Sequence, residues 1–313
     1  MHSDNGVKFM RLFDLHCDTI GECYKEKASL RKNNFSVSLE KGKVFENYTQ
    51  VFAIWIPDEL RGQKAKDYFN KVCNYYNTEL SLNRDLVIRY APETKNDKRI
   101  KAILAVEGGA VLGGDAEEIY NIYERGVRLM TLTWNKENEI ASGAFCEDGG
   151  LTEFGKSILR KMEKLKMVID VSHLNRQSFF DVAEASEVPF IASHSNPDIV
   201  ENPFGKKRNL NDEQIKIIKE RSGLIGINFC KDFLESDKKG FEAINRHLSY
   251  LLDKGCENVI ALGSDFDGCT LAEGITGLES MKSLYEFLLQ KGYDEKMVAD
   301  LFYNNANRFF SHI

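Results

Sequence analysis

The stretch from Arg11 to Ile20 reads RLFDLHCDTI, a short apolar run that ends in a His-x-Asp pair. Side chains two residues apart on a β-strand point to the same face of the sheet. At the end of such a strand, the His16 imidazole and the Asp18 carboxylate point toward one spot, while Cys17 turns the other way. Both groups are accepted ligands of divalent metal ions, so this strand end predicts one part of a metal site.

Seven more short apolar runs follow, and segments with helical periodicity separate them. Together the eight runs span residues 12–16, 51–56, 102–107, 129–133, 168–171, 190–193, 224–229 and 259–263. The clearest helices are predicted over residues 151–165, where Phe154, Ile158 and Met162 share a face, and over 281–289, before Gly292. Short strands alternating with helices are typical of parallel sheets. We therefore predict an α/β fold, a (β/α)8 TIM barrel, with an open doubly wound sheet as the alternative.

The composition is that of an ordinary globular protein. The 313 residues are 42% hydrophobic and 29% charged, and no Pro-rich linker or repeat divides them, which predicts a single domain over residues 1–313. The net charge of −6 argues against a nucleic-acid partner. No signal peptide or membrane-spanning run is visible, which predicts a cytoplasmic protein without a membrane partner. Seven scattered cysteines without a CxxC pair argue against disulfides and a thiolate zinc site.

Potential metal ligands stand at the ends of the predicted strands. Histidines and carboxylates close or directly follow five of the runs: His16 and Asp18 the first, Glu107 the third, His173 the fifth, His194 the sixth and Asp265 the eighth. In a barrel of parallel strands, all these ends lie on the rim where barrel enzymes place their chemistry. Singly, each residue has a structural interpretation, such as a hydrogen-bonded pair, a turn carboxylate or a helix cap. Their joint occurrence favours a metal centre.

The donor set indicates which metal the centre holds. Nitrogen and oxygen ligands without thiolates suit a catalytic zinc or a similar divalent ion. Five ligands exceed the need of one tetrahedral ion with an open position, so we predict two ions. Glu107 is the natural bridge between them, because its strand lies between the one that contributes His16 and Asp18 and those that contribute His173 and His194.

These motifs resemble a known family, the renal (membrane) dipeptidases, which are binuclear zinc enzymes of the metal-dependent hydrolase barrel superfamily. The resemblance covers most of the chain. It runs through DLHCDT, AVEGG, GVRLMTLTWN, LTEFGKSILRKMEKLKMVIDVSH, FIASHSN, KRNLNDEQ, GSDFDG and NNANRFF. It implies a TIM barrel of the metal-dependent hydrolase type that hydrolyses dipeptides, including L-Xaa-D-Xaa substrates, through attack by a metal-bound hydroxide. Members of the family are often homodimers.

The resemblance also implies a role for each matched residue. His16 and Asp18 would bind one zinc ion, His173 and His194 the other, and Glu107 would bridge the two. Asp265 would be the catalytic acid and base, and Arg208 would hold the C-terminal carboxylate of the dipeptide.

The chain departs from the mammalian family members after the fourth predicted strand, where Trp134 replaces a histidine. An indole donates one hydrogen bond and cannot act as a cation. We expect Trp134 to form a wall of the substrate pocket, and Asn135 to offer a neutral donor there. Two alternatives therefore stay open: a non-catalytic barrel that binds a metal or a small molecule, and an amidohydrolase acting on another small amide.

Overall fold

The computed structural model describes residues 10–94, 96–234 and 239–311, and within these ranges nine parallel strands form one sheet. The prediction that the chain begins without a signal peptide falls on residues 1–9, which lie outside the described residues. The strands are β1 (Arg11–Cys17), β2 (Asn47–Trp55), β3 (Val87–Arg89), β4 (Ile100–Glu107), β5 (Val127–Thr131), β6 (Val168–Asp170), β7 (Ile191–Ala192), β8 (Leu224–Ile227) and β9 (Ile260–Leu262).

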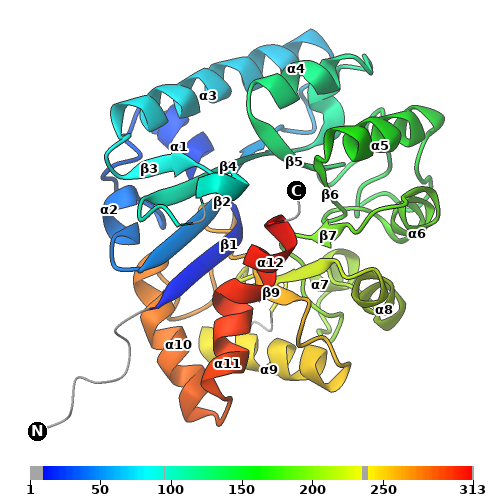
Figure 1. Cartoon of the computed structure of the whole chain (residues 1–313). Helices are drawn as coiled ribbons and strands as arrows, with labels where there is room; N and C mark the ends of the chain where they lie inside the picture. Colours follow the sequence, from blue (N-terminus) through cyan, green and yellow to red (C-terminus); the bar gives the residue numbers. More distant parts are fainter. Residues whose placement is uncertain (1–9, 95, 235–238, 312–313) are drawn as a thin grey trace, which may run out of the picture.

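Eight of these strands close into a barrel (Figure 1). The hydrogen-bonded order is β2-β1-β9-β8-β7-β6-β5-β4-β3, and β2 also pairs with β4, from Thr49 opposite Lys101 to Trp55 opposite Glu107. This last pairing closes the sheet, so the predicted TIM barrel is confirmed and the open sheet is not formed.

The helices surround the barrel. They are α1 (Thr19–Glu26), α2 (Leu39–Gly42), α3 (Gln63–Leu82), α4 (Glu118–Glu124), α5 (Glu153–Leu165), α6 (Arg176–Ala185), α7 (Pro203–Arg208), α8 (Asp212–Glu220), α9 (Gly240–Asp253), α10 (Met281–Gln290), α11 (Glu295–Ala299) and α12 (Asn305–Phe310). Short 3-10 turns are η1 (Pro92–Thr94), η2 (Gly109–Leu112) and η3 (Leu278–Ser280), and η4 (Asp300–Asn304) is a π-helical turn. The predicted helices over 151–165 and 281–289 correspond to α5 and α10.

The apolar side chains form two layers. The inner layer fills the barrel and includes Phe13, Leu15, Val51, Leu129 and Leu224, one side chain or more from most strands. The outer layer packs the barrel against the surrounding helices. At the end of the barrel where the strands begin, α12 lies across the opening (Figure 1), and its residues Ala306 and Phe310 pack into the inner layer. Only the opposite end, where the strands finish, is left for the predicted site.

The predicted strands are present, with shifted ends. β2 begins at Asn47 rather than at residue 51. The apolar pattern missed its first half because that half contains the polar residues Thr49 and Gln50, which are buried in the structure. β7 is reduced to Ile191 and Ala192. β3 is an addition that apolar patterning did not predict, since its three residues VIR include only one that is buried. No helix among the described residues is long and apolar enough to cross a membrane.

Candidate metal centre

The predicted ligands gather at the end of the barrel where the strands finish. His16 and Glu107 lie at the ends of β1 and β4, and Asp18 precedes α1. His173, His194 and Asp265 stand in the turns that follow β6, β7 and β9. All six are buried, none more than 9% exposed. The barrel thus unites carboxylates and imidazoles that lie far apart in the sequence.

A β-bulge in β1 directs His16 into this cluster. Asp14 lies opposite Gln50 of β2, whereas Cys17 lies opposite Phe52, so β1 takes three steps where β2 takes two. The extra residue reverses the alternation of side chains: Leu15 belongs to the inner layer, while Cys17, two residues later, belongs to the outer layer. Bulges commonly redirect a side chain beside an active site.

Glu107 lies between the histidines. Its Oε1 is 2.8 Å from Nε2 of His173 and 3.4 Å from Nε2 of His194, while its Oε2 is 3.8 Å from Nε2 of His16. His16 Nε2 is also 3.2 Å from Oδ2 of Asp18. The two oxygens of one carboxylate therefore face two separate groups of ligands, as a bridging carboxylate requires.

Hydrogen bonds determine which nitrogen of each imidazole is free. Nδ1 of His173 is 3.0 Å from the amide oxygen of Asn135, which can only accept, so Nδ1 carries the proton. Nδ1 of His194 is 2.7 Å from Oγ of Ser193, whose own proton is donated to Asp170. Nδ1 of His194 must then donate as well. In both rings Nε2 is left with its lone pair, the form in which histidine binds metals.

The charge states of the histidines fit a bound cation. Burial, followed by the positive charges of Arg208 and His16, holds the pKa of His173 well below its usual value, and burial does the same for His194. Two unprotonated Nε2 atoms only 2.9 Å apart repel each other unless a cation lies between them. Nitrogen atoms at this spacing suit one ion at roughly 2.0–2.1 Å from each.

His16 is in a different electrostatic setting. Burial lowers its pKa, but the carboxylates of Asp18, Glu107 and Asp265 outweigh burial and raise the pKa to about 10. These carboxylates therefore attract positive charge strongly, and a divalent ion would supply it in place of the proton. Two groups of residues bring their ligand atoms within 4.8 Å of one another. One group is His16, Glu107 and His194, and the other is His16, Asp18 and Asp265. The residues fit the two metal ions that the sequence predicts.

Asp265 completes the carboxylate group. Burial and the charge of nearby Asp18 raise its pKa above the usual value, against the opposing attraction of His16. Its Oδ2 accepts a hydrogen bond of 2.9 Å from the amide of Asn228. Gly268 lies against this group: a Cβ there would stand 2.2 Å from Oδ2 of Asp18 and 2.5 Å from Oδ1 of Asp265. Any side chain at position 268 would intrude between the two carboxylates.

The backbone is strained at two of the predicted site residues. His173 has φ of 67° and Asp265 has φ of 61°, in the left-handed region that residues other than glycine rarely occupy. Such conformations persist where the surrounding structure enforces them, and they are concentrated at functional sites. Here they turn both side chains from the strand ends toward the cluster.

Arg208, Trp134 and Asn135 surround the ligands. Asn135 holds His173, as described, and the Trp134 ring lies 6.3 Å from the His173 ring. Arg208 is 4% exposed, donates a long hydrogen bond of 3.4 Å to the carbonyl of His194, and has its guanidinium 5.1 Å over the Phe233 ring. Arg208 is therefore buried beside the His194 ligand, and it is not among the residues that border the cavity above the cluster.

A cavity of about 390 Å³ opens above the cluster. It is bordered by Asp18, Glu107, His173 and Asp265, by the predicted Trp134 and Asn135, and by Phe233. It is also bordered by side chains that sequence reasoning did not single out, among them Glu22, Lys25, Trp55, Tyr68, Phe145 and Phe204. Trp55 is the last residue of β2, one position before the end of the apolar run 51–56, so a search of strand ends like the one that found Glu107 could have found it. Glu22 and Lys25 belong to α1, Tyr68 to α3 and Phe204 to α7, and nothing in the pattern of these helices marks a residue as bordering a cavity.

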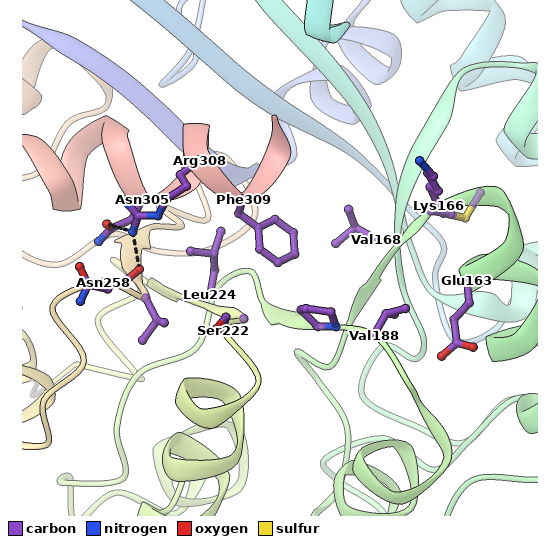
Figure 2. Close-up of a pocket in the computed structure, with 14 residues that line it drawn as sticks. Glu163, Lys166, Val168, Val188, Ser222, Leu224, Asn258, Asn305, Arg308 and Phe309 are labelled. Carbon is purple, nitrogen blue, oxygen red and sulfur yellow. Dashed lines mark hydrogen bonds between the residues drawn. The ribbon is translucent and has the colours of Figure 1, made fainter. Parts of the chain in front are cut away.

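A second, larger cavity of about 660 Å³ lies at the other end of the barrel. Figure 2 shows Phe309 of α12 between Leu224 and Val168, with Lys166 and Glu163 at one side and Arg308 at the other. Its walls are mainly apolar. Both candidate groups of metal ligands within the described residues lie at the opposite end, so the smaller cavity is the candidate active site.

Comparisons with known proteins agree with this geometry. The chain matches the membrane dipeptidase family (Peptidase family M19) over residues 7–313. An uncharacterized protein in the pqqA 5′ region of Klebsiella pneumoniae is 32% identical over 231 residues, which cover 70% of this chain and 84% of that protein.

Two solved structures of metallopeptidases are similar over nearly the whole chain. Dipeptidase AC, of family M19, has a TM-score of 0.87 at 27% identity and covers 95% of this chain and 96% of its own. A metallopeptidase from Rhodobacter sphaeroides, bound to a phosphinate mimic of L-Ala-D-Ala, has a TM-score of 0.86 at 26% identity, over 95% and 97%. The chain therefore belongs to the membrane dipeptidase family and is a metal-dependent hydrolase of peptide bonds.

Proposed function

We propose that this protein is a binuclear zinc dipeptidase whose substrates include L-Xaa-D-Xaa dipeptides. The observation that carries the proposal is the convergence of unprotonated Nε2 atoms of His173 and His194 on one oxygen of Glu107, whose other oxygen faces His16. This arrangement suits two ions with a shared carboxylate.

In this proposal, each metal position has its own ligands. His16 and Asp18 hold one ion, His173 and His194 hold the other, and Glu107 binds both. The absence of thiolates from this set favours zinc or a similar ion in a catalytic rather than a structural role. When bound, two such ions would lower the pKa of a water molecule and polarise the scissile carbonyl.

Asp265 is the proposed acid and base. It borders the cavity, and its buried carboxylate, with a pKa above the usual value, has a heightened affinity for a proton. Asp265 takes a proton from the attacking water and delivers it to the leaving amine. Asn228 holds the carboxylate in place through its hydrogen bond to Oδ2.

Arg208 is the proposed anchor for the C-terminal carboxylate of the substrate. It is buried and makes no ion pair within the described residues, and its Nε has no hydrogen-bond acceptor there. The carboxylates of Asp265 and Glu107 act on it only from a distance, and a buried cation is stabilised best by a counterion bonded directly to it. A bound carboxylate would supply the missing charge through the planar fork of the guanidinium.

The proposed acceptance of a D-residue at the C-terminal position rests on the R. sphaeroides relative, which was solved with a mimic of L-Ala-D-Ala. The test is a library of L,L and L,D dipeptides assayed with zinc-loaded protein, together with metal analysis. We expect about two ions per chain and turnover of both stereochemical classes. Failure to hydrolyse any dipeptide would reject the proposed activity. Hydrolysis of L,L dipeptides alone would reject the proposed acceptance of a D-residue at the C-terminal position.

Two variants separate the proposed roles. Asp265→Asn should retain metal but lose most turnover, because the amide cannot carry the proton. Arg208→Ala should impair hydrolysis of dipeptides with a free carboxylate more than that of amidated ones. Lys206→Ala is its control, since this nearby cation is exposed and pairs with Glu201.

A further inference from the structure

We infer that this enzyme prefers dipeptides whose N-terminal residue bears an aromatic or other large apolar side chain, and that Trp55 and Trp134 form the wall that selects it. The inference rests on the proposed function, in which Arg208 holds the carboxylate at the other end of the substrate.

The two tryptophans form one aromatic surface beside Glu107. Trp55 is the last residue of β2 and lies opposite Glu107 of β4. Trp134 follows β5, the strand on the other side of β4. Their rings meet edge to face, with centroids 4.9 Å apart and an angle of 68° between the planes. Both side chains border the cavity above the ligands.

Arg208 approaches from across the barrel. Around the closed sheet the order is β1, β2, β4, β5, β6, β7, β8, β9, so the connection from β7 to β8, which contains α7 and Arg208, lies opposite β2 and β4. A dipeptide with its carboxylate at Arg208 and its scissile carbonyl above Glu107 must extend its N-terminal residue toward β2 and β5. The side chain of that residue then meets Trp55 and Trp134.

The surroundings of the tryptophans suit an uncharged side chain. Ile54 and Tyr68 also border this cavity. Lys25 lies 5.4 Å over the Trp55 ring, but its ammonium bonds to the Glu22 carboxylate at 2.6 Å, so the two charges compensate each other. An apolar wall of two indole rings favours aromatic side chains, through buried area and through edge-to-face contacts with the rings.

The first test compares four dipeptides on the metal-loaded full chain. We expect kcat/KM for Phe-Ala to exceed that for Gly-Ala about tenfold or more, and Ala-Phe to exceed Ala-Gly by less than about threefold. The second pair of substrates shows whether the preference belongs to the N-terminal position or to any large side chain.

Variants then locate the preference. Trp55→Ala and Trp134→Ala should each reduce the ratio of kcat/KM for Phe-Ala to that for Gly-Ala severalfold toward one. Phe204→Ala is the matched control, because Phe204 borders the same cavity but pairs with Phe145 and belongs to α7, on the Arg208 side. It should keep the ratio. Because each ratio is taken within one protein preparation, partial misfolding of a variant does not alter it.

Binding provides a readout independent of turnover. The chain contains only 2 tryptophans, which are Trp55 and Trp134, so tryptophan emission reports on this wall alone. Phosphinate analogues of Phe-Ala and Gly-Ala, titrated into metal-loaded protein, should differ: the Phe analogue should change the emission more and bind about tenfold more tightly.

The outcomes distinguish the two proposals. Equal kcat/KM for Phe-Ala and Gly-Ala, or a preference confined to the second residue, would overturn this inference and leave the dipeptidase function standing. A ratio that survives both tryptophan substitutions would also overturn it. Hydrolysis of no dipeptide at all would reject the function and the inference together.

Discussion

His173 and His194 show how the fold prepares candidate metal ligands residue by residue. Burial lowers the pKa of both imidazoles, so they stay neutral, and acceptors at Nδ1 leave the lone pair of each Nε2 facing the cluster. In water, the same histidines would exchange tautomers and protonate near pH 6.5. In the folded protein, both the tautomer and the neutral state of each imidazole are set without a bound metal.

Glu107 tests the proposed bridge. Glu107→Gln replaces a charged oxygen by an amide nitrogen that does not bind metals, so we expect the metal content to fall at both positions, from about two ions to fewer than one. Elemental analysis of purified protein gives the answer. Glu79→Gln is the control, because Glu79 is a buried carboxylate on α3 that accepts hydrogen bonds from Ser29 and Leu30. Retention of two ions in Glu107→Gln would exclude a bridging role.

Gly268 tests the tight approach of the carboxylates. In Gly268→Ala the new methyl group would overlap Asp18 and Asp265, so one of them must move. We expect at least about tenfold weaker metal binding and a loss of about 1–3 kcal/mol of stability, as for other overpacked sites. Metal titration and urea unfolding measure the two effects. Gly21→Ala is the control, since a Cβ at position 21 meets nothing within 4 Å.

At the scale of elements, one buried carboxylate joins the ends of three strands. Asp170, at the end of β6, accepts hydrogen bonds from Oγ1 of Thr131 in β5 and from both the amide and Oγ of Ser193, which follows β7. Ser193 in turn accepts the Nδ1 proton of His194. The strands therefore position the ligand through a relay that lies beneath it.

Asp170→Asn interrupts this relay. The amide nitrogen of the new side chain would compete as a donor, so that Ser193 could turn its proton toward His194 and displace the imidazole proton to Nε2. We expect about 10–100-fold weaker binding of one metal ion, with the other retained. Calorimetric titration would resolve the two sites. Ser195→Ala is the control, because the buried Ser195 hydroxyl donates to Ser172 and not to Asp170, Ser193 or His194. It should leave both affinities unchanged, and equal affinities in the two variants would refute the relay.

At the scale of the whole molecule, a closed barrel buries polar groups as well as apolar ones. His247 of α9 is completely buried, and burial, with the charge of Arg246, lowers its pKa to about 3. In the unfolded chain the His247 imidazole binds a proton near pH 6.5, whereas in the folded protein it binds one only near pH 3. The stability that neutral His247 permits is therefore present above pH 6.5 and is lost as the pH falls.

His247→Leu should remove this acid sensitivity. Between pH 7.5 and pH 5, the free energy of unfolding of the wild type should fall by about 2 kcal/mol more than that of the variant. Urea unfolding of both proteins in the same buffers measures the difference. Since the metal ligands titrate alike in the two proteins, their contribution cancels. An identical pH dependence would show that His247 ionises normally in the folded state.

The position of the site along the chain was largely predictable. The six candidate ligands and Asn135 occur at strand ends or just after them, and the parallel barrel brings all such ends to one rim. Nothing in the local pattern distinguishes β3 from a loop. Nor does it show that Arg208 is buried while Lys206 and Lys207 are exposed, because its burial depends on distant residues such as Phe233. The predicted single domain, the homodimer and the cytoplasmic location stay predictions.

By itself, the sequence determined the alternation of strands and helices, the class of fold and the choice of candidate metal ligands, because hydrophobic periodicity and residue chemistry are local properties. Only the tertiary structure decided how His16 reaches the cluster, since a bulge between Asp14 and Cys17 depends on the register with β2. It also decided which nitrogens face the metal positions, and that Trp55 and Trp134 meet beside Glu107. These features arise where separate strands come into contact, and no single segment of the chain encodes such a contact.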